Sequence, residues 1–145
     1  MVELMPAGGE REITDPALVG EWAEALRGLS ESLAPPWGLY LARSHGMPSG
    51  VGLFKGPPDE SGWAEIAYLS FLPARRQGVA SAIAGQLVAI AAREGATGVR
   101  AHTMPQRDAS TRVLERNGFV LWGEVIDPDD GPVWRWELPL PGRSE

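Results

Sequence analysis

The sequence predicts a single α/β (α+β) domain over residues 1–145, with a mixed sheet flanked by helices. Three observations predict this fold class. A length of 145 residues suits one hydrophobic core. Strand-like runs are interrupted by only three helical patterns, and residues 63–94 have the pattern of a strand, a glycine turn and a helix.

The first predicted element is a helix that begins at Asp15, a typical N-cap residue, with Pro16 at the first helical position. Apolar residues at helical spacing carry this helix to about Leu29. Apolar runs bounded by glycine and proline predict the strands. The predicted strands cover residues 38–43, 49–54, 63–72, 98–104, 119–126 and 133–138. We expect the first two strands to form a meander and the last two to form a hairpin.

Two further helices are predicted in the second half of the chain. One covers residues 81–94 and ends at Gly95, which can adopt the left-handed conformation common after a helix. The other is short: Asp108 or Ser110 caps it, and Gly118 stops it.

Composition and charge exclude several classes of function. The formal net charge is −6 and no basic patch is present, which argues against a nucleic-acid-binding protein. The sequence has no cysteine, which excludes disulfides, thiolate metal sites and a cysteine nucleophile. His45 and His102 lack the spacing of metal ligands, so we expect no metal. Neither a signal sequence nor a membrane-spanning segment is evident, and we expect a cytoplasmic protein with no membrane partner.

Residues 73–82 join an apolar strand to a helix through a turn of small residues, which is a favourable place for phosphate to bind. The first N–H groups of a helix have no intrahelical partner and point out from the positive end of its dipole. Gly78 can adopt a positive φ and, with Ala80, keeps the approach open, while Arg75 and Arg76 add positive charge. The sequence has neither the three glycines of a dinucleotide-binding turn nor the Gly-Lys-Ser/Thr of a P-loop.

Two segments resemble the signatures of the GNAT superfamily of N-acetyltransferases. Residues 75–80 read Arg-Arg-Gln-Gly-Val-Ala, and residues 109–119 contain Val-Leu-Glu-Arg-Asn-Gly-Phe. Together with the Ala-Glu-Ile of the preceding strand, they are similar to the branch that acetylates the N-termini of ribosomal proteins. Residues 65–119 carry the resemblance, and the first sixty residues fit only by the order of their elements. The resemblance implies a mostly antiparallel central sheet with splayed middle strands.

The resemblance also implies acetyl-CoA as cosubstrate. Its pyrophosphate would lie on backbone amides between Arg76 and Ser81, and its pantetheine arm would pair with the exposed backbone of residues 69–71. Arg75, Arg76 or Arg112 would reach the adenosine 3′-phosphate or remain solvated. The implied cofactor-binding residues are Leu69, Ser70, Phe71, Arg75, Arg76, Gln77, Gly78, Val79, Ala80 and Ser81.

The sequence departs from the family pattern at two positions. Many members have a cofactor-contacting asparagine two residues before the Ala-Ser of the second segment, where this chain has Arg107. Many also have a tyrosine general acid in that helix, at the position that Leu114 occupies here. Neither the asparagine contact nor a tyrosine acid is therefore expected at these two positions.

Acetyl transfer to nitrogen needs a neutral amine, and deprotonating a lysine-type amine at neutral pH costs roughly 4–5 kcal/mol. A carboxylate that takes the proton, directly or through water, would assist the attack. Glu65 is the first candidate for this base because it lies on the strand that leads into the turn, on the same face as Ala67 and Leu69. The alternative interpretation is a surface carboxylate at the end of a strand.

Other polar residues also have both a catalytic and a structural interpretation. Ser110 is the candidate acid or water-holding residue, and its alternative role is a helix cap. Tyr68 could replace it as the acid, but alternation places Tyr68 opposite Glu65, which favours a core or groove role. His102 is favoured as a structural histidine over a base. The acidic residues within 127–130 favour a solvated turn over a calcium site.

The sequence therefore predicts an enzyme that transfers an acetyl group from acetyl-CoA to a primary amine by direct attack in a ternary complex. The acceptor would be a peptide N-terminus, a lysine or a small amine, and the negative charge of the protein favours a cationic one. One alternative, favoured by Arg107 and the missing tyrosine, is a CoA-binding regulatory or interaction module with little turnover. A nucleotide-binding protein is a third hypothesis. A homodimer is expected from the family resemblance only.

Overall fold

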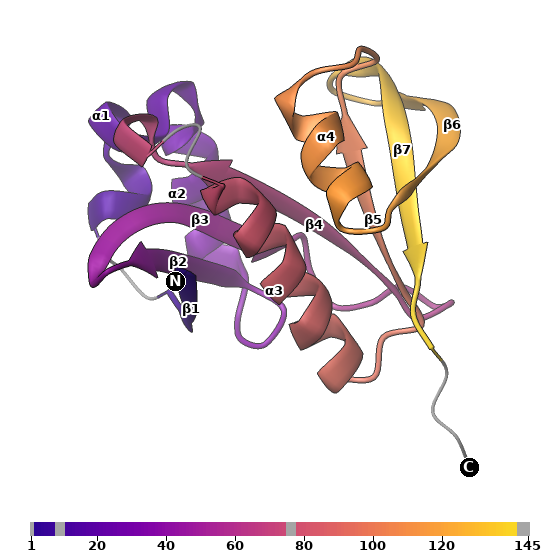
Figure 1. Cartoon of the computed structure of the whole chain (residues 1–145), viewed down its shortest axis with the longest axis horizontal. Coiled ribbons are helices and arrows are strands. Elements are labelled where there is room, and N and C mark those ends of the chain that lie inside the picture. The colour runs from indigo at the N-terminus through magenta and orange to yellow at the C-terminus, as the bar shows by residue number, and fades with distance from the viewer. Residues whose placement is uncertain (1, 8–10, 75–77, 142–145) are drawn as a thin grey trace.

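The structure is a computed structural model that describes residues 2–7, 11–74 and 78–141 (Figure 1). Its elements in chain order are β1 (Val2–Pro6), η1 (Arg11–Thr14), α1 (Pro16–Val19), η2 (Gly20–Trp22), α2 (Ala23–Ser32), β2 (Leu39–Ser44), β3 (Met47–Phe54), β4 (Trp63–Ser70), η3 (Leu72–Ala74), α3 (Val79–Arg93), β5 (Gly98–Thr103), α4 (Ala109–Arg116), β6 (Val120–Asp127) and β7 (Gly131–Pro139), where η marks a 3₁₀ turn.

The strands in the described residues form one seven-stranded sheet in the order β1-β2-β3-β4-β5-β7-β6. Each neighbouring pair is antiparallel except β4 and β5, which run parallel. This arrangement confirms the predicted mixed, mostly antiparallel sheet. Across the described ranges, no helix is long and apolar enough to cross a membrane.

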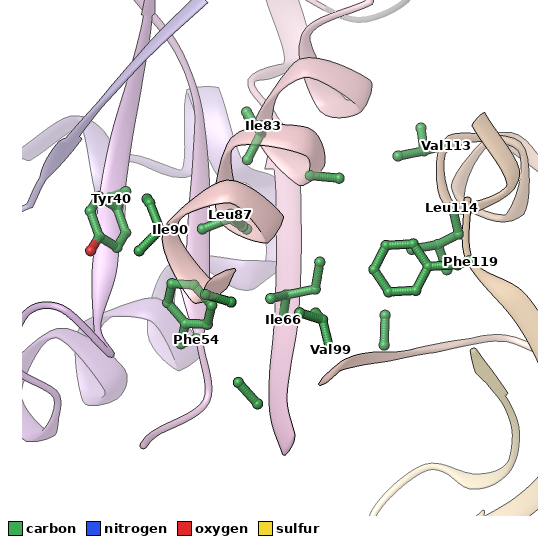
Figure 2. Packing of buried hydrophobic residues seen from close by; sticks show 14 of the residues in the cluster. Tyr40, Phe54, Ile66, Ile83, Leu87, Ile90, Val99, Val113, Leu114 and Phe119 are labelled. Atoms are coloured by element: carbon green, nitrogen blue, oxygen red, sulfur yellow. The ribbon is translucent and has the colours of Figure 1, made fainter. Parts of the chain in front are cut away.

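Two clusters of buried side chains hold helices against the two faces of the sheet. On one face, Ile83 and Leu87 of α3 and Leu114 of α4 belong to a large cluster that reaches from β2 to β7. On the opposite face, Val19 of α1 and Leu26 of α2 pack with β2, β3 and the end of β4. Figure 2 labels Tyr40, Phe54, Ile66, Ile83, Leu87, Ile90, Val99, Val113, Leu114 and Phe119 of the first cluster.

Two glycines of β3 let α3 lie close to the sheet. A Cβ atom on Gly52 would lie 2.5 Å from Cγ2 of Ile83, and a Cβ atom on Gly50 would lie 2.8 Å from Cδ1 of the same side chain. Both distances are shorter than van der Waals contact allows. The missing Cβ atoms therefore set the depth at which α3 packs, and α3 begins beside the end of β4 (Figure 1).

The structure corrects the predicted first helix. Asp15 is the N-cap, as predicted, and its carboxylate accepts a hydrogen bond of 2.9 Å from the N–H of Ala17. However, Gly20 has a φ of 62° and ends α1, so a 3₁₀ turn separates α1 from α2. The helical path then resumes and continues to Ser32 rather than ending at Leu29. The apolar spacing persists across this break, and so the pattern alone does not detect it.

The first strand, β1, was not predicted. A side chain of α3 satisfies the outer edge of this strand: Oε1 of Gln86 accepts a hydrogen bond of 3.2 Å from the N–H of Leu4, and Nε2 of Gln86 donates to the carbonyl oxygen of Val2. Contacts between residues more than eighty positions apart stabilise β1, and a local sequence pattern does not reveal them.

The remaining predicted elements are present with shifted ends. β3 begins at Met47 rather than at residue 49, because His45 takes a positive φ of 52° in a tight turn. β4 ends at Ser70 rather than at residue 72, because Leu72–Ala74 forms a 3₁₀ turn. The next helix, α3, begins two residues before its predicted start, at Val79.

The turn of the terminal hairpin contains the acidic residues within 127–130. Oδ1 of Asp127 accepts hydrogen bonds from the N–H groups of Asp129, at 2.8 Å, and Asp130, at 3.0 Å. This geometry is that of a solvated turn, as predicted. Nowhere in the described part of the chain do three metal-ligating side chains gather.

Candidate functional site

The middle strands of the sheet part from each other, as Figure 1 shows. The parallel pair β4 and β5 is joined only where residues 63–65 lie beside residues 98–100. Beyond this point β4 continues along β3, whereas β5 continues along β7. The result is a V-shaped gap with its apex at Glu65 and Arg100, which confirms the predicted splay.

The backbone of β4 alternates between pairing with β3 and facing the gap. The carbonyl oxygen of Glu65 accepts from the N–H of Lys55 at 2.9 Å, and the N–H of Phe71 donates to the carbonyl oxygen of Ser49 at 2.8 Å. Odd-numbered residues therefore point their backbone groups toward β3. By the same alternation, the backbone groups of Tyr68 and Ser70 point into the gap.

This alternation bears on the predicted pantetheine-binding backbone, residues 69–71. Ser70 faces the gap, whereas Leu69 is paired with Val51 of β3 and the N–H of Phe71 is already bonded. Tyr68, which the sequence analysis did not place in this set, has the same backbone orientation as Ser70. The side chains of Leu69 and Phe71 instead pack with α1 and α2 on the face opposite α3.

The N-terminus of α3 provides backbone donors that have no partner within the described residues. Gly78 is the N-cap residue with a φ of 75°, and a Cβ atom there would meet no atom within 4 Å. The first intrahelical bond joins the N–H of Ala82 to the carbonyl oxygen of Gly78 at 3.2 Å. The amides of Val79, Ala80 and Ser81 precede it and have no partner within the helix. Arg75, Arg76 and Gln77, also predicted here, lie outside the described residues.

Glu65 lies at the apex of the gap, with two basic side chains on the same carboxylate oxygen. Oε2 of Glu65 is 2.9 Å from Nζ of Lys55 and 3.1 Å from Nδ1 of His102. Burial raises the pKa of the Glu65 carboxyl, but the hydrogen bonds and charges of Lys55 and then of His102 outweigh burial and lower it. Glu65 is therefore ionised at neutral pH, and it is not an isolated surface carboxylate.

His102 brings the second wall of the gap into the site. It lies on β5, two residues beyond Arg100, the last residue that pairs with β4. Its Nε2 atom has no hydrogen bond with any residue in the described ranges, whereas Nδ1 faces Glu65. The side chain is about one-fifth exposed. A histidine that sequence reasoning favoured as structural thus meets the candidate base directly.

Ser110 and Tyr68 lie on the α4 side of the sheet. The hydroxyl of Tyr68 donates a hydrogen bond of 3.1 Å to the carbonyl oxygen of Ser110. Burial, and then the charge of Asp108, raise the pKa of Tyr68. The N-cap of α4 is Asp108, which forms a capping box with Thr111, so Ser110 does not cap this helix. The structure does not bring Ser110 into contact with Glu65.

The two positions that depart from the family pattern have structural contacts. Arg107 lies over the rings of Trp134 and Trp136, at 5.5 and 5.8 Å from their centres, and pairs with Glu115 at 3.2 Å. Leu114 is fully buried beneath α4. The first residue anchors the start of α4 to β7, and the second provides core packing.

Comparison with known proteins agrees with this geometry. The profile of the acetyltransferase (GNAT) domain matches residues 5–120, which is most of the chain. The chain belongs to the GNAT acetyltransferase family. No curated protein matched this GNAT domain.

Several solved structures share the fold of this GNAT domain. An acetyltransferase from Salmonella typhimurium that modifies the N-terminal serine of ribosomal protein L7/L12 has a TM-score of 0.76 at 18% identity, with 97% of this chain and 95% of that chain covered. The ribosomal-protein-S18-alanine N-acetyltransferase from Escherichia coli has a TM-score of 0.76 at 12% identity, covering 100% and 97%. An aminoglycoside acetyltransferase in complex with coenzyme A and kanamycin has a TM-score of 0.75 at 19% identity, covering 96% and 95%.

GNAT acetyltransferases use acetyl-CoA, and the described residues of this domain suit that cosubstrate. The amides that begin α3 can donate to a diphosphate, and the open position at Gly78 leaves room for its approach. The backbone of Tyr68 and Ser70 offers donors and acceptors to an extended amide-containing chain. Bound there, acetyl-CoA supplies the activated acetyl group.

Sequence reasoning missed the contacts of Glu65 with Lys55 and His102. Residues 55, 65 and 102 come from three different segments, and their meeting depends on the order of the strands and on the register of β4 with β5. The only sequence signal for these contacts was the alternation of side chains along a strand. His102 and Arg100 share a face of β5, and Arg100 lies opposite Glu65.

Proposed function

We propose that this GNAT domain transfers an acetyl group from acetyl-CoA to a primary amine by direct attack in a ternary complex. The observation that carries the proposal is the ionised carboxylate of Glu65 at the apex of the gap between β4 and β5. The acceptor classes are a peptide N-terminus, a lysine side chain and a small amine.

The chemistry of amine acetylation supports this assignment. An attacking amine becomes positively charged on nitrogen and must lose a proton as the amide forms. A negative charge beside the attacking nitrogen stabilises the developing positive charge, and proton transfer to a positioned group contributes about 10²–10⁴-fold in rate. Glu65 supplies that negative charge, directly or through the groups bonded to it.

The solved structures of similar fold support an amine acceptor. One of them modifies the N-terminal serine of a ribosomal protein, another is a ribosomal-protein-alanine N-acetyltransferase, and a third was solved with the aminoglycoside kanamycin. The formal net charge of −6 favours a cationic acceptor over an anionic one.

A CoA-binding module with little turnover is the second candidate function. The observation that favours it is the buried leucine, Leu114, at the position of the family's tyrosine acid, together with Arg107, which lies over the rings of Trp134 and Trp136 where many members have the asparagine. The leaving thiolate does not require a strong acid, because thiols are weak acids, with cysteine ionising near pH 8.5, and a thiolate is a moderately good leaving group. Turnover is therefore possible without that tyrosine.

The proposed reaction fits a protein that acts in the cytoplasm, where acetyl-CoA is a common metabolite. Family resemblance supports a homodimer, and the acidic charge supports a role away from nucleic acid and membranes. Sedimentation of the purified protein tests the dimer.

The experiment that tests the function measures free thiol released from acetyl-CoA in the presence of peptides, polyamines, lysine derivatives and aminoglycosides. We expect release with at least one amine and an acetylated product that is heavier by one acetyl group. If the protein binds coenzyme A but releases no thiol with any amine, the binding-module function is correct instead. Mass spectrometry of the products identifies the acceptor class.

A further inference from the structure

The bond between His102 and Glu65 fixes which nitrogen of the imidazole carries a proton. Oε2 of Glu65 already accepts from Nζ of Lys55 at 2.9 Å, and the carboxylate is ionised. An ionised carboxylate only accepts hydrogen bonds. Nδ1 of His102, at 3.1 Å from the same oxygen, therefore donates its hydrogen, and the neutral imidazole has its lone pair on Nε2.

In this arrangement the atom that can accept a proton, Nε2 of His102, is separate from the negatively charged carboxylate of Glu65. We infer that Nε2 of His102 takes the proton from the acceptor nitrogen, and that Glu65 is a positioning residue that acts through Nδ1. The inference rests on the proposed function and assigns the base within that site. It also explains why two cationic or proton-bearing groups converge on the carboxylate of Glu65.

Glu65 alone is a poor direct base in this geometry. Its Oε2 atom has two partners, and its pKa is lowered, so it binds a proton weakly near neutral pH. An imidazole has an ordinary pKa close to neutral, which suits general base catalysis. His102 lies on β5, two residues beyond the last residue that pairs with β4, so it extends from the strand that forms the other side of the gap.

The charged groups near His102 on its own strand and on the neighbouring strand β7 form ion pairs. Arg100, on the same strand and face, is paired with Asp59 at 3.0 Å, and Arg135, across on β7, is paired with Glu137 at 2.6 Å. Each arginine is thus matched by a carboxylate.

The remaining charged neighbours come from two other elements. Lys55, after β3, is bonded to Glu65. The pKa of Asp127, at the end of β6, is lowered by the N–H groups of Asp130 and Asp129 and, to a smaller degree, by the charges of Lys55 and His102. Glu65 and Asp127 therefore both provide negative charge near the imidazole.

The acceptor nitrogen forms a bond to the acetyl carbonyl carbon with its lone pair, and the thioester carbon–sulfur bond breaks with its electron pair remaining on sulfur. The proton lost from nitrogen goes to Nε2 of His102. The imidazolium then returns that proton to the thiolate, directly or through water, so that the products are the acetylated amine and free thiol.

The first arm of the test observes the tautomer without any turnover. The chain has two histidines, so His45→Gln, in the exposed β2–β3 turn, leaves His102 as the only imidazole. Nitrogen-15 NMR at neutral pH should show a protonated Nδ1 and an unprotonated Nε2. Adding Glu65→Gln should abolish the dominance of this tautomer. A dominant tautomer with hydrogen on Nε2 in the His45→Gln protein would overturn the inference.

The second arm measures turnover with the amine that the thiol-release screen identifies. His102→Gln and His102→Asn should each lower kcat by about 100-fold or more while changing the KM for acetyl-CoA less than about threefold. Glu65→Gln should lower kcat less than either His102 variant and should alter the pH dependence of kcat, because Nδ1 of His102 loses its carboxylate partner. Added imidazole should partly restore activity to His102→Gly.

The outcomes separate the inference from the proposed function. Folded His102 variants with undiminished kcat, alongside an inactive Glu65→Gln, would identify Glu65 as the direct base and overturn the inference. An inactive parent protein that nevertheless binds coenzyme A would overturn the proposed function, and the catalytic role of His102 with it, while the NMR result would still report the tautomer.

Discussion

The hydroxyl of Tyr68 on β4 donates a hydrogen bond of 3.1 Å to the carbonyl oxygen of Ser110 on α4. This bond connects the two halves of the molecule beyond the point where β4 and β5 part. It lies on the α4 side of the sheet, whereas Glu65 and His102 meet on the opposite face. The two faces of the sheet therefore differ beside the gap. The hydrogen bond between Tyr68 and Ser110 lies on one face, and the charged pair of Glu65 and His102 lies on the other.

Tyr68→Phe tests whether this hydroxyl is structural or catalytic. Loss of the hydrogen bond should lower the free energy of unfolding by about 1 kcal/mol, the usual net value for such a bond. A structural role predicts a change in kcat smaller than about tenfold, well below the effect of losing a general acid. Urea unfolding and steady-state kinetics measure the two quantities. A drop of two orders of magnitude in kcat with unchanged stability would instead make Tyr68 the acid.

The two tyrosines should both resist ionisation in the folded protein. Burial raises the pKa of Tyr40, and burial with the charge of Asp108 raises the pKa of Tyr68. An unfolded tyrosine ionises at about pH 10, so stability from these groups is complete below that pH and declines as the pH rises above it. Tyrosinate absorbance during an alkaline titration measures this. Native protein that ionises both phenols near pH 10 would contradict the burial seen at these residues.

Glu65 should contribute to stability in the opposite pH direction. Burial raises its pKa, but Lys55 and His102 lower it overall. The contribution of the ionised carboxylate is therefore present above its unfolded pKa of about 4.3 and is lost as the pH falls through the lower folded pKa. Melting temperatures between about pH 6 and pH 2 should fall less steeply for Glu65→Gln than for the parent.

The control for that experiment is Glu24→Gln, on the exposed surface of α2. It removes one negative charge outside the gap and should leave the acid dependence of the melting temperature close to that of the parent. Identical pH profiles for Glu65→Gln and the parent would show that Lys55 and His102 do not hold the carboxylate ionised in solution.

Gly52→Ala should destabilise the domain by about 1–3 kcal/mol, the usual range for overpacking a core. The added Cβ atom would lie 2.5 Å from Cγ2 of Ile83, which would force α3 away from the sheet. Gly28→Ala is the matched control, because no atom lies within 4 Å of a Cβ atom there and the residue is inside α2. This control should be stabilising by roughly 0.5–1 kcal/mol. Equal unfolding midpoints for the two variants would refute the close packing of α3 on β3.

Gly78→Ala tests the N-terminus of α3 as the diphosphate site. Alanine is strained at a φ of 75°, by about 1–2 kcal/mol, so the start of α3 should shift and its first amides should lose their alignment. Gly46→Ala introduces similar strain at a φ of 80° in the β2–β3 turn, where a Cβ atom also meets nothing within 4 Å. We expect coenzyme A affinity to fall in the first variant only. Equal affinities in both variants would place the diphosphate elsewhere.

Local chemistry allowed much of the fold to be predicted from sequence, and long-range contacts account for the rest. The strand, turn and helix around Gly78 were evident because apolar runs and a helix start are local patterns. β1 was missed because Gln86, far along the chain, satisfies its edge. The break at Gly20 was missed because the helical spacing of apolar residues continues through it.

The candidate site, too, was predictable only where local patterns determine it. Glu65 was predicted from its strand and face, and the structure places it at the apex of the gap. The role of Ser110 as a cap was open in the sequence, and the capping box of Asp108 with Thr111 resolves it. A structural role was favoured for His102 because its contact with Glu65 depends on the parallel register of β4 and β5, which no short motif encodes.

The most direct test of the account is calorimetric titration of the purified protein with coenzyme A. The amides at the start of α3, which have no partner within that helix, and the unpaired backbone of β4 beyond its junction with β5 predict saturable binding at one site per chain, weakened by Gly78→Ala and unchanged by Gly46→Ala. A protein that binds no coenzyme A at millimolar concentration would contradict the central claim that this gap holds the acetyl donor.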